Sequence, residues 1–131
     1  MILHLIHCEC TNWLPRVQLI LSDAEDRRFT PLNRTAHPDV HFGSTLPELL
    51  QSFAELRSEN IRQLRALTLT DTDLERTALH PEFGTVTLSQ LLSTWAVHDL
   101  DHLSQIARFM AHQYKDSVGP WKAYLRIVRE N

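Results

Sequence analysis

TLSQLLSTWAVHDLDHLSQIARFMA, residues 87–111, is the longest strongly periodic stretch of the chain and decides its fold. Thr87 and Gln90 match a capping box, in which each side chain bonds a backbone N–H that the first helical turn leaves unpaired. The large apolar side chains fall on one broad stripe at helical spacing, which is typical of a helix packed on a core. That stripe comprises Leu88, Leu91, Leu92, Trp95, Leu103, Ile106, Phe109 and Met110.

This stretch also carries two histidines, His98 and His102, four residues apart. Imidazoles at positions i and i+4 lie one turn apart on the same helix face, so both can reach one divalent ion. Asp99 lies near the middle of the stripe, where a buried carboxylate requires a partner. The same spacing also arises by chance among eight histidines, and the pair His37 and His41 is of that kind. A metal site at His98 and His102 therefore needs a third ligand.

Length and composition favour one globular domain over residues 1–131, with 43% hydrophobic and 22% charged residues. The net charge of −3 and the lack of a basic cluster argue against nucleic-acid binding. No apolar run reaches the length of a membrane span, and the N-terminus lacks the features of a signal peptide. We therefore expect no membrane association and a cytoplasmic location.

The opening stretch, residues 1–23, has apolar residues at helical intervals and predicts a helix to about Leu21. Pro15 predicts a kink or a new start near Leu14, because proline lacks a backbone donor and crowds the preceding turn.

This first helix contains several residues that can coordinate a transition metal. They are His4, His7, Cys8, Glu9 and Cys10. The apolar stripe includes His7 and Cys10, whereas His4 and Cys8 fall to one side of it, so periodicity alone selects no ligand. The two cysteines are too close for an ordinary disulfide, and we expect reduced thiols that pack as small core or boundary residues.

Residues 23–44 show no period and predict a long loop, a type of segment that often rims a site. Phe29, Pro31 and Leu32 are expected to pin it to the body. Its polar residues either face a pocket or are solvated, and they include Arg34, His37, Asp39 and His41.

A further helix is predicted from the capping box of Thr45 and Glu48 to about Ala66. Its predicted buried stripe comprises Leu49, Leu50, Phe53, Leu56, Leu64 and Leu67, and its predicted solvated face carries Glu55, Arg57, Glu59, Arg62 and Arg65.

The remaining chain predicts two short helical segments. One is a turn of helix at residues 71–74 within the connection 68–86, and the other is a last short helix with Trp121, Leu125 and Val128 on one side. No alternating β-branched run of strand length appears, so we expect no sheet. The predicted class is all-α, a helical bundle with sites between facing helices.

Three segments together resemble the DinB/YfiT-like superfamily. Residues 80–106, HPEFGTVTLSQLLSTWAVHDLDHLSQI, are similar to its signature of His-Pro and Gly before a helix with His-Asp-x-x-His and Gln-Ile. HLIHCE at residues 4–9, followed by Trp13, resembles the first ligand helix of that family. PLNR at residues 31–34 resembles a further shared segment, although Asn33 stands where relatives often have an acidic residue.

The resemblance implies an up-down four-helix bundle that holds a divalent metal, usually zinc or nickel, on three histidines. Carried over to this chain, these are His4, His98 and His102. Three imidazoles would leave coordination positions open for water or for a thiolate, as in catalytic sites. Relatives normally carry a further helix before the first ligand. The sequence lacks that N-terminal helix, so either the start of the chain is placed late or a second subunit covers the exposed apolar face. Of these we expect a homodimer.

The leading hypothesis is therefore a metal-dependent enzyme that acts on a small-molecule substrate, as a thiol-dependent S-transferase using a low-molecular-weight thiol or as a hydrolase. In this hypothesis Asp99 either orients a ligand imidazole or packs in the core. Cys8 is an alternative ligand. The competing hypothesis is a non-catalytic, stress-induced helical dimer with a vestigial metal site.

Overall fold

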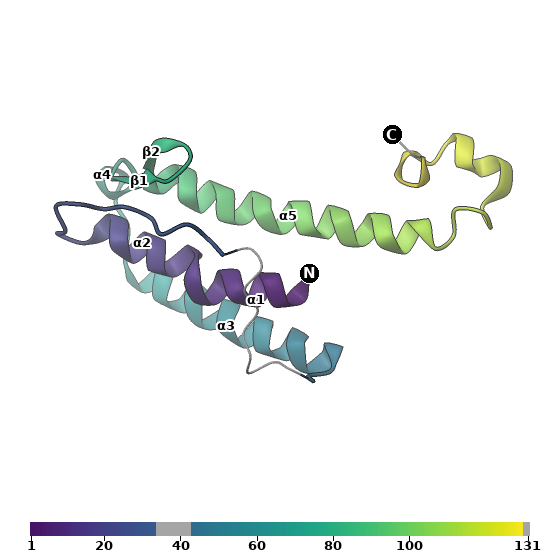
Figure 1. Ribbon diagram of the computed structural model, residues 1–131, viewed down its shortest axis with the longest axis horizontal. Helices are drawn as coiled ribbons and strands as arrows, with labels where there is room; N and C mark the ends of the chain where they lie inside the picture. The colour runs from purple at the N-terminus through teal and green to yellow at the C-terminus, as the bar shows by residue number, and fades with distance from the viewer. Residues whose placement is uncertain (34–42, 130–131) are drawn as a thin grey trace. The chain divides into compact units, whose positions relative to one another are not determined.

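The computed structural model describes residues 1–33 and 43–129 (Figure 1). The chain divides into two compact units, Met1–Ser93 and Thr94–Asn131, with the boundary inside a long helix. Candidate residues Arg34, His37, Asp39 and His41 lie outside the described residues. The all-α class is confirmed, while the single domain stays a prediction.

The first helical stretch consists of two helices, α1 (Ile2–Thr11) and α2 (Trp13–Leu21). They are separated at Asn12, whose φ of −104° and ψ of −60° end the regular hydrogen bonding of α1. Pro15 lies in the first turn of α2, where its missing N–H leaves no helical hydrogen bond unmade. The predicted break is confirmed, two residues before Leu14.

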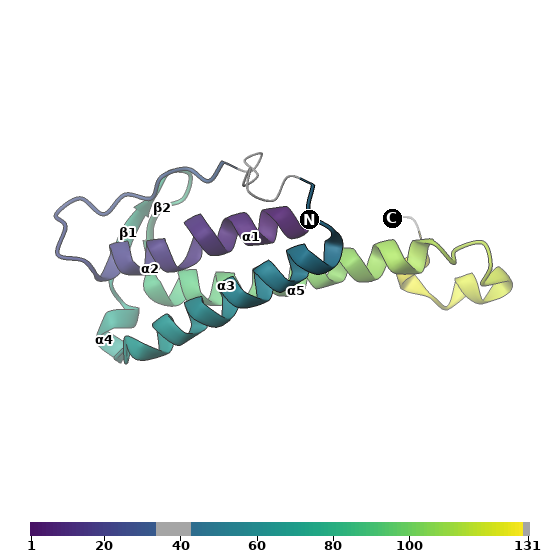
Figure 2. The same ribbon diagram turned by 90° about the horizontal axis from the view of Figure 1, so that it is seen from below.

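Helix α3 (Leu46–Ala66) lies side by side with α1 (Figure 2). It begins at the predicted capping box, in which the Thr45 N–H donates to Glu48 Oε2 at 2.6 Å. Most of its predicted stripe is half-buried, but Leu50 and Leu67 are 46% and 38% exposed. Its one buried residue is polar, namely Asn60.

A buried carboxylate joins α1 to α3. Glu9 is 2% exposed, and its Oε1 lies 2.8 Å from Arg57 Nη2. Asn60 Nδ2 donates to Glu9 Oε2 at 3.0 Å and to the Glu9 carbonyl oxygen at 2.8 Å. The prediction that Arg57 lies on a solvated outer face is therefore wrong. A long arginine side chain at the edge of a helix face can lay its stem along the neighbour and reach a partner on it.

A β-hairpin follows α3 and the short helix α4 (Asp71–Leu74), which confirms the predicted turn of helix but contradicts the expectation of no sheet. Strand β1 (Thr77–His80) pairs antiparallel with β2 (Gly84–Thr87). Thr85, Val86 and Thr87 are β-branched and suit a strand. Gly84 has a φ of +74°, a conformation in which glycine carries little strain, and it closes the turn.

The chain before residue 33 is attached to the edge of this hairpin. The Phe29 N–H donates to the Leu79 carbonyl at 2.9 Å, and the Leu79 N–H donates to the Arg27 carbonyl at 2.8 Å. Phe29 is 5% exposed, as predicted for a residue that pins the loop, whereas Leu32 is half-buried and Pro31 is exposed.

Helix α5 (Leu88–His112) begins directly after β2. Its predicted capping box is present, because the Thr87 N–H donates to Gln90 Oε1 at 2.9 Å and the Gln90 N–H donates to Thr87 Oγ1 at 3.1 Å. Leu88 and Leu91 contribute to the core of the first unit, together with Ile6, Val17 and Ile20.

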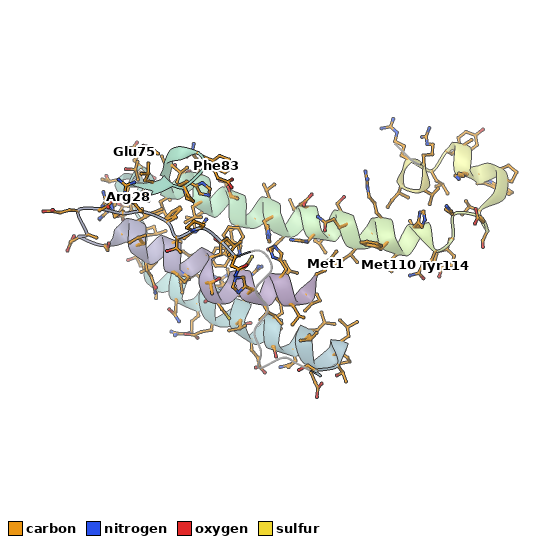
Figure 3. All side chains as sticks on the ribbon, in the orientation of Figure 1. Met1, Arg28, Glu75, Phe83, Met110 and Tyr114 are labelled. Atoms are coloured by element: carbon orange, nitrogen blue, oxygen red, sulfur yellow. The ribbon has the colours of Figure 1, made fainter. Side chains whose placement is uncertain are left out.

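In the second unit the predicted burial fails over the later part of α5. Leu103, Phe109 and Met110 are 60%, 69% and 62% exposed. Figure 3 labels Met110 among the side chains of this helix. The predicted last helix is also wrong, since the chain forms two 3₁₀ turns, η2 (Gly119–Ala123) and η3 (Arg126–Val128). Of the three residues predicted to share one side of that helix, Val128 is 4% exposed, while Trp121 is 69% and Leu125 39% exposed. Among the described residues, no helix is long and apolar enough to cross a membrane.

Replacing the buried carboxylate tests the joint between α1 and α3. In the metal-free protein, Glu9→Gln leaves the Arg57 charge without its counter-ion and should lower the free energy of unfolding by about 3 kcal/mol. Urea denaturation measures the change. The matched control is Glu59→Gln, which breaks an exposed pair with Arg62 on α3 and should lower the stability far less, because solvent screens the pair. Equal losses in the two variants would contradict a special role for Glu9.

The hairpin turn should be sensitive to acid. His80 Nδ1 accepts hydrogen bonds from the N–H groups of Glu82 and Phe83, at 3.1 and 3.3 Å, and therefore must be unprotonated. Burial, aided by the Arg16 charge, lowers the pKa of His80 below its ordinary 6.5. The stability that the neutral ring contributes is thus complete above pH 6.5 and is lost as the pH falls through the lowered pKa.

When the pH is lowered from about 7 to about 5, the range in which histidines usually titrate, amide hydrogen exchange of the hairpin should speed up after correction for intrinsic exchange rates. In His80→Asn, whose side-chain oxygen accepts hydrogen bonds without titrating, the hairpin should keep its protection at both pH values. The same acid-induced loss in this variant would show that His80 is not the responsible group.

Candidate metal centre

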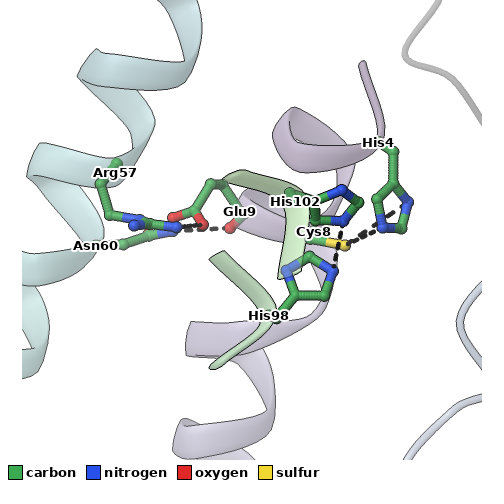
Figure 4. Close-up of polar contacts among 7 residues, drawn as sticks. All are labelled: His4, Cys8, Glu9, Arg57, Asn60, His98 and His102. Carbon is green, nitrogen blue, oxygen red and sulfur yellow. Dashed lines mark hydrogen bonds and ion pairs between the residues drawn. The ribbon is translucent and has the colours of Figure 1, made fainter. Parts of the chain in front are cut away.

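Helix α5 positions the two histidines that the sequence singled out. Both are half-buried, and their Nε2 atoms lie 3.2 Å apart (Figure 4). The rings are nearly perpendicular, at 75°, with centroids 4.4 Å apart. The i, i+4 spacing therefore brings the two imidazoles together, and it is the Nε2 atoms that approach each other.

The separation of these two nitrogens suits two ligands of one ion. Imidazole nitrogens at 2.0–2.1 Å from a tetrahedral zinc ion lie about 3.3 Å from each other. Both Nε2 atoms must then be unprotonated, with the ring proton on Nδ1. Without an ion, the same contact is a hydrogen bond in which one Nε2–H donates to the other ring. The pair can thus take up a metal with almost no change in the separation of its nitrogens.

Helix α1 positions a second pair. His4 is half-buried, and its Nε2 and Nδ1 atoms lie 3.7 and 4.0 Å from the sulfur of Cys8 (Figure 4). A sulfur and an imidazole nitrogen that bind one tetrahedral zinc ion are about 3.6 Å apart. His7, which the apolar periodicity had favoured, instead lies 3.4 Å from the hydroxyl oxygen of Thr11.

Without a metal, the side chain of Cys8 strongly favours its protonated form, the thiol, over the thiolate. Its side chain is 1% exposed, and burial raises its pKa to about 11, with a smaller contribution from the negative charge of Glu9. The nearby Arg16 charge opposes this shift. Cys10 is exposed, and burial and Glu9 also raise its pKa. At neutral pH, therefore, Cys8 is a protonated, shielded neighbour of His4 unless a metal displaces its proton.

The remaining candidate carboxylates have different surroundings. Both carboxylate oxygens of Glu9 bond to α3, through Arg57 and Asn60, so this residue serves as a structural counter-ion. Asp99 is half-buried on α5, and its role as a support for a ligand imidazole stays a prediction.

The structure thus forms two pairs of possible ligands, one in each compact unit. His4 and Cys8 meet in the first unit, and His98 and His102 meet in the second. The set of three histidines stays a prediction. Cys8 stands four residues after His4, the spacing on which its prediction as an alternative ligand rests, and the structure brings its sulfur close to the His4 ring. Its role as a ligand stays a prediction.

Two comparisons with known proteins bear on this arrangement. The family model described as the DinB superfamily matches residues 1–106, a span that includes both pairs. A search of curated proteins finds no match.

The two thiols should differ sharply in reactivity. At pH 8, a pKa of about 11 leaves about one Cys8 side chain in a thousand as thiolate, and burial shields that fraction. Iodoacetamide should therefore modify metal-free protein once, at Cys10, and reach Cys8 only after unfolding in urea. Peptide mass spectrometry identifies the modified residue. Cys10→Ser should show no fast modification, and rapid labelling of Cys8 in this variant would contradict the burial of the thiol.

Proposed function

The chain belongs to the DinB superfamily, and from this premise we propose that it is a metal-dependent enzyme in which His4, His98 and His102 hold one divalent ion. The observation that carries the proposal is the 3.2 Å separation of the His98 and His102 Nε2 atoms, which matches two ligands of one ion. The place of His4 in the set rests on the resemblance of its segment to the first ligand helix of the family.

The donor chemistry fits a borderline metal such as zinc or nickel. Imidazole nitrogen suits both ions, and three neutral ligands leave the charge of the ion uncompensated. When bound, such an ion supplies Lewis acidity, which activates water or an incoming thiolate. Cys8 is a further candidate ligand beside His4. Its sulfur, like the imidazole nitrogens of His4 and His98, is a donor that zinc accepts.

For the reaction we propose group transfer from a low-molecular-weight thiol to a small electrophilic substrate in the cytoplasm, with hydrolysis as the other possible reaction. The chain contributes shielding and ligand orientation to either reaction. Where Cys8 is not itself a ligand, its buried thiol stays protonated at neutral pH and does not compete as a nucleophile with an incoming thiolate. The Glu9 network holds the helix that carries His4.

A second candidate function is supported by the apolar surface of α5. Val97, Leu100, Leu103, Phe109 and Met110 are each at least 60% exposed, and exposed apolar groups of this kind favour association. The protein would then be a non-catalytic helical homodimer, formed under stress, that retains a vestigial metal site. In the enzyme hypothesis the same surface supports a catalytic homodimer.

Metal content decides between the two functions. Untagged protein, purified without added metal, should carry nearly one zinc or nickel ion per chain by plasma mass spectrometry. His102→Ala should bind the ion at least about a hundredfold more weakly, because it loses a direct ligand. His112→Ala, an exposed histidine at the end of the same helix, is the matched control and should keep the ion.

Native mass spectrometry of the same samples gives the oligomeric state. A stable dimer without bound metal, even after incubation with excess zinc and nickel, would replace the enzyme proposal by the non-catalytic one. Cys8→Ser separates the possible ligand sets. Retained metal supports three histidines, while loss of metal in Cys8→Ser but not in His102→Ala would put Cys8 in place of His102.

A further inference from the structure

The first unit contains a small cavity, with both apolar and polar lining, that the proposed metal site does not use. Its volume is about 200 Å³, and it lies between the junction of α1 with α2 and the segment Thr30–Asn33. Its polar lining includes His7, Thr11, Asn12, Arg16 and Thr30. None of the described residues that line it is acidic. The lining therefore has a positive charge from Arg16 and no described carboxylate to balance it.

Arg16 is the charged group of this cavity. Its Nη2 donates to the Thr30 carbonyl at 3.1 Å, and its guanidinium carbon lies 4.6 Å from the centroid of the Phe29 ring. Within residues 1–33 and 43–129, no carboxylate forms an ion pair with it. A guanidinium has five N–H donors in a fork that matches a carboxylate, so donors remain beyond the one used by Thr30. Such a half-buried cation favours an anionic partner.

Asn12 adds an acceptor to the same lining. Its side chain is 5% exposed, and in the described part of the chain its Oδ1 is buried without a hydrogen-bond partner. Leaving a buried acceptor unbonded costs free energy, which a ligand with a donor group can recover. The Thr11 hydroxyl donates to the His7 carbonyl at 2.8 Å, so its oxygen also remains an acceptor.

We propose that this cavity binds a small carboxylate that also carries a hydrogen-bond donor, such as a hydroxy or amino group. The fork of Arg16 pairs with the carboxylate, and the side-chain oxygens of Asn12 and Thr11 are the available acceptors for the donor. The volume equals that of roughly six or seven liquid waters and is below that of typical drug-sized pockets, so the ligand has only a few carbon atoms.

The proposal does not depend on the metal site, because none of the residues that line the cavity is one of the proposed metal ligands. The test therefore uses the full chain stripped of metal with a chelator. Glycolate is the probe, since it combines a carboxylate with a hydroxyl group. Acetate lacks the hydroxyl, and glycolamide keeps the hydroxyl but replaces the charged carboxylate with a neutral amide.

Amide chemical shifts in ¹⁵N spectra give the affinity and the location of binding. Glycolate should titrate to saturation, with the largest shifts at residues 11–16 and 30–33. Acetate should bind about tenfold more weakly and glycolamide at least about tenfold more weakly, since each lacks one of the two matched groups. Glycolamide that binds as tightly as glycolate, or saturation with the largest shifts elsewhere, would overturn the proposal.

Variants locate the charge that is responsible. Arg16→Gln should weaken glycolate binding at least about tenfold. Arg28→Gln, which removes an exposed arginine paired with Asp26 in the same stretch of chain, should leave binding unchanged. If Arg16→Gln fails to fold, Arg16→Lys keeps the charge but not the fork and should weaken binding several-fold. Unchanged binding in a folded Arg16 variant, or no saturable binding of glycolate to wild type, would refute the site.

Discussion

A buried carboxylate sets the position of the first helix, and the polar arrangement of the first unit follows from it. Glu9 is almost completely removed from water, so its charge is tolerable only with a counter-ion and hydrogen bonds. Arg57 and Asn60 supply these from α3, and Asn60 also bonds the Glu9 main chain. Side chain and backbone are thus held together, which restricts both the rotation of α1 about its axis and its sliding along α3.

Because Cys8 precedes Glu9 directly and His4 lies about one turn before Cys8, this restraint also fixes the direction in which the possible ligands project.

The second pair of possible ligands depends on where α5 begins. The capping box of Thr87 and Gln90 starts the helix directly after strand β2, and the hairpin is itself tied to the Arg27–Phe29 segment. His98 follows Thr87 by about three helical turns, and His102 by about four. The start of the helix therefore determines the face on which both imidazoles lie. Each compact unit prepares a pair of donors by the same i, i+4 spacing, so local helix geometry sets the separation within each pair.

Features that depend on nearby residues could be predicted from the sequence, and features that depend on distant partners could not. The two long helices, their capping boxes, the break before Pro15 and the pair His98 and His102 all arise from residues within a few positions of one another. The hairpin was missed because its strands are only four residues long, and their pairing with each other and with Arg28 is not encoded in periodicity. Arg57 was placed on the wrong face because its partner lies 48 residues away in the chain. The stripe on α5 predicts amphipathicity, but it cannot say which part of the helix is covered.

The break at Asn12 has a consequence for the chemistry of α1 as well as for its geometry. At 100° per residue, the pair His7 and Thr11 is rotated by about 60° from the pair His4 and Cys8, so the two pairs occupy adjacent faces of one helix. Arg16 follows the break and lines the cavity together with His7 and Thr11. Its charge also acts on Cys8, which lies on the neighbouring face with His4. A carboxylate beside Arg16 and a divalent cation on His4 have opposite charges and would attract each other. By linkage, whichever binds first must then tighten the binding of the other by the same factor.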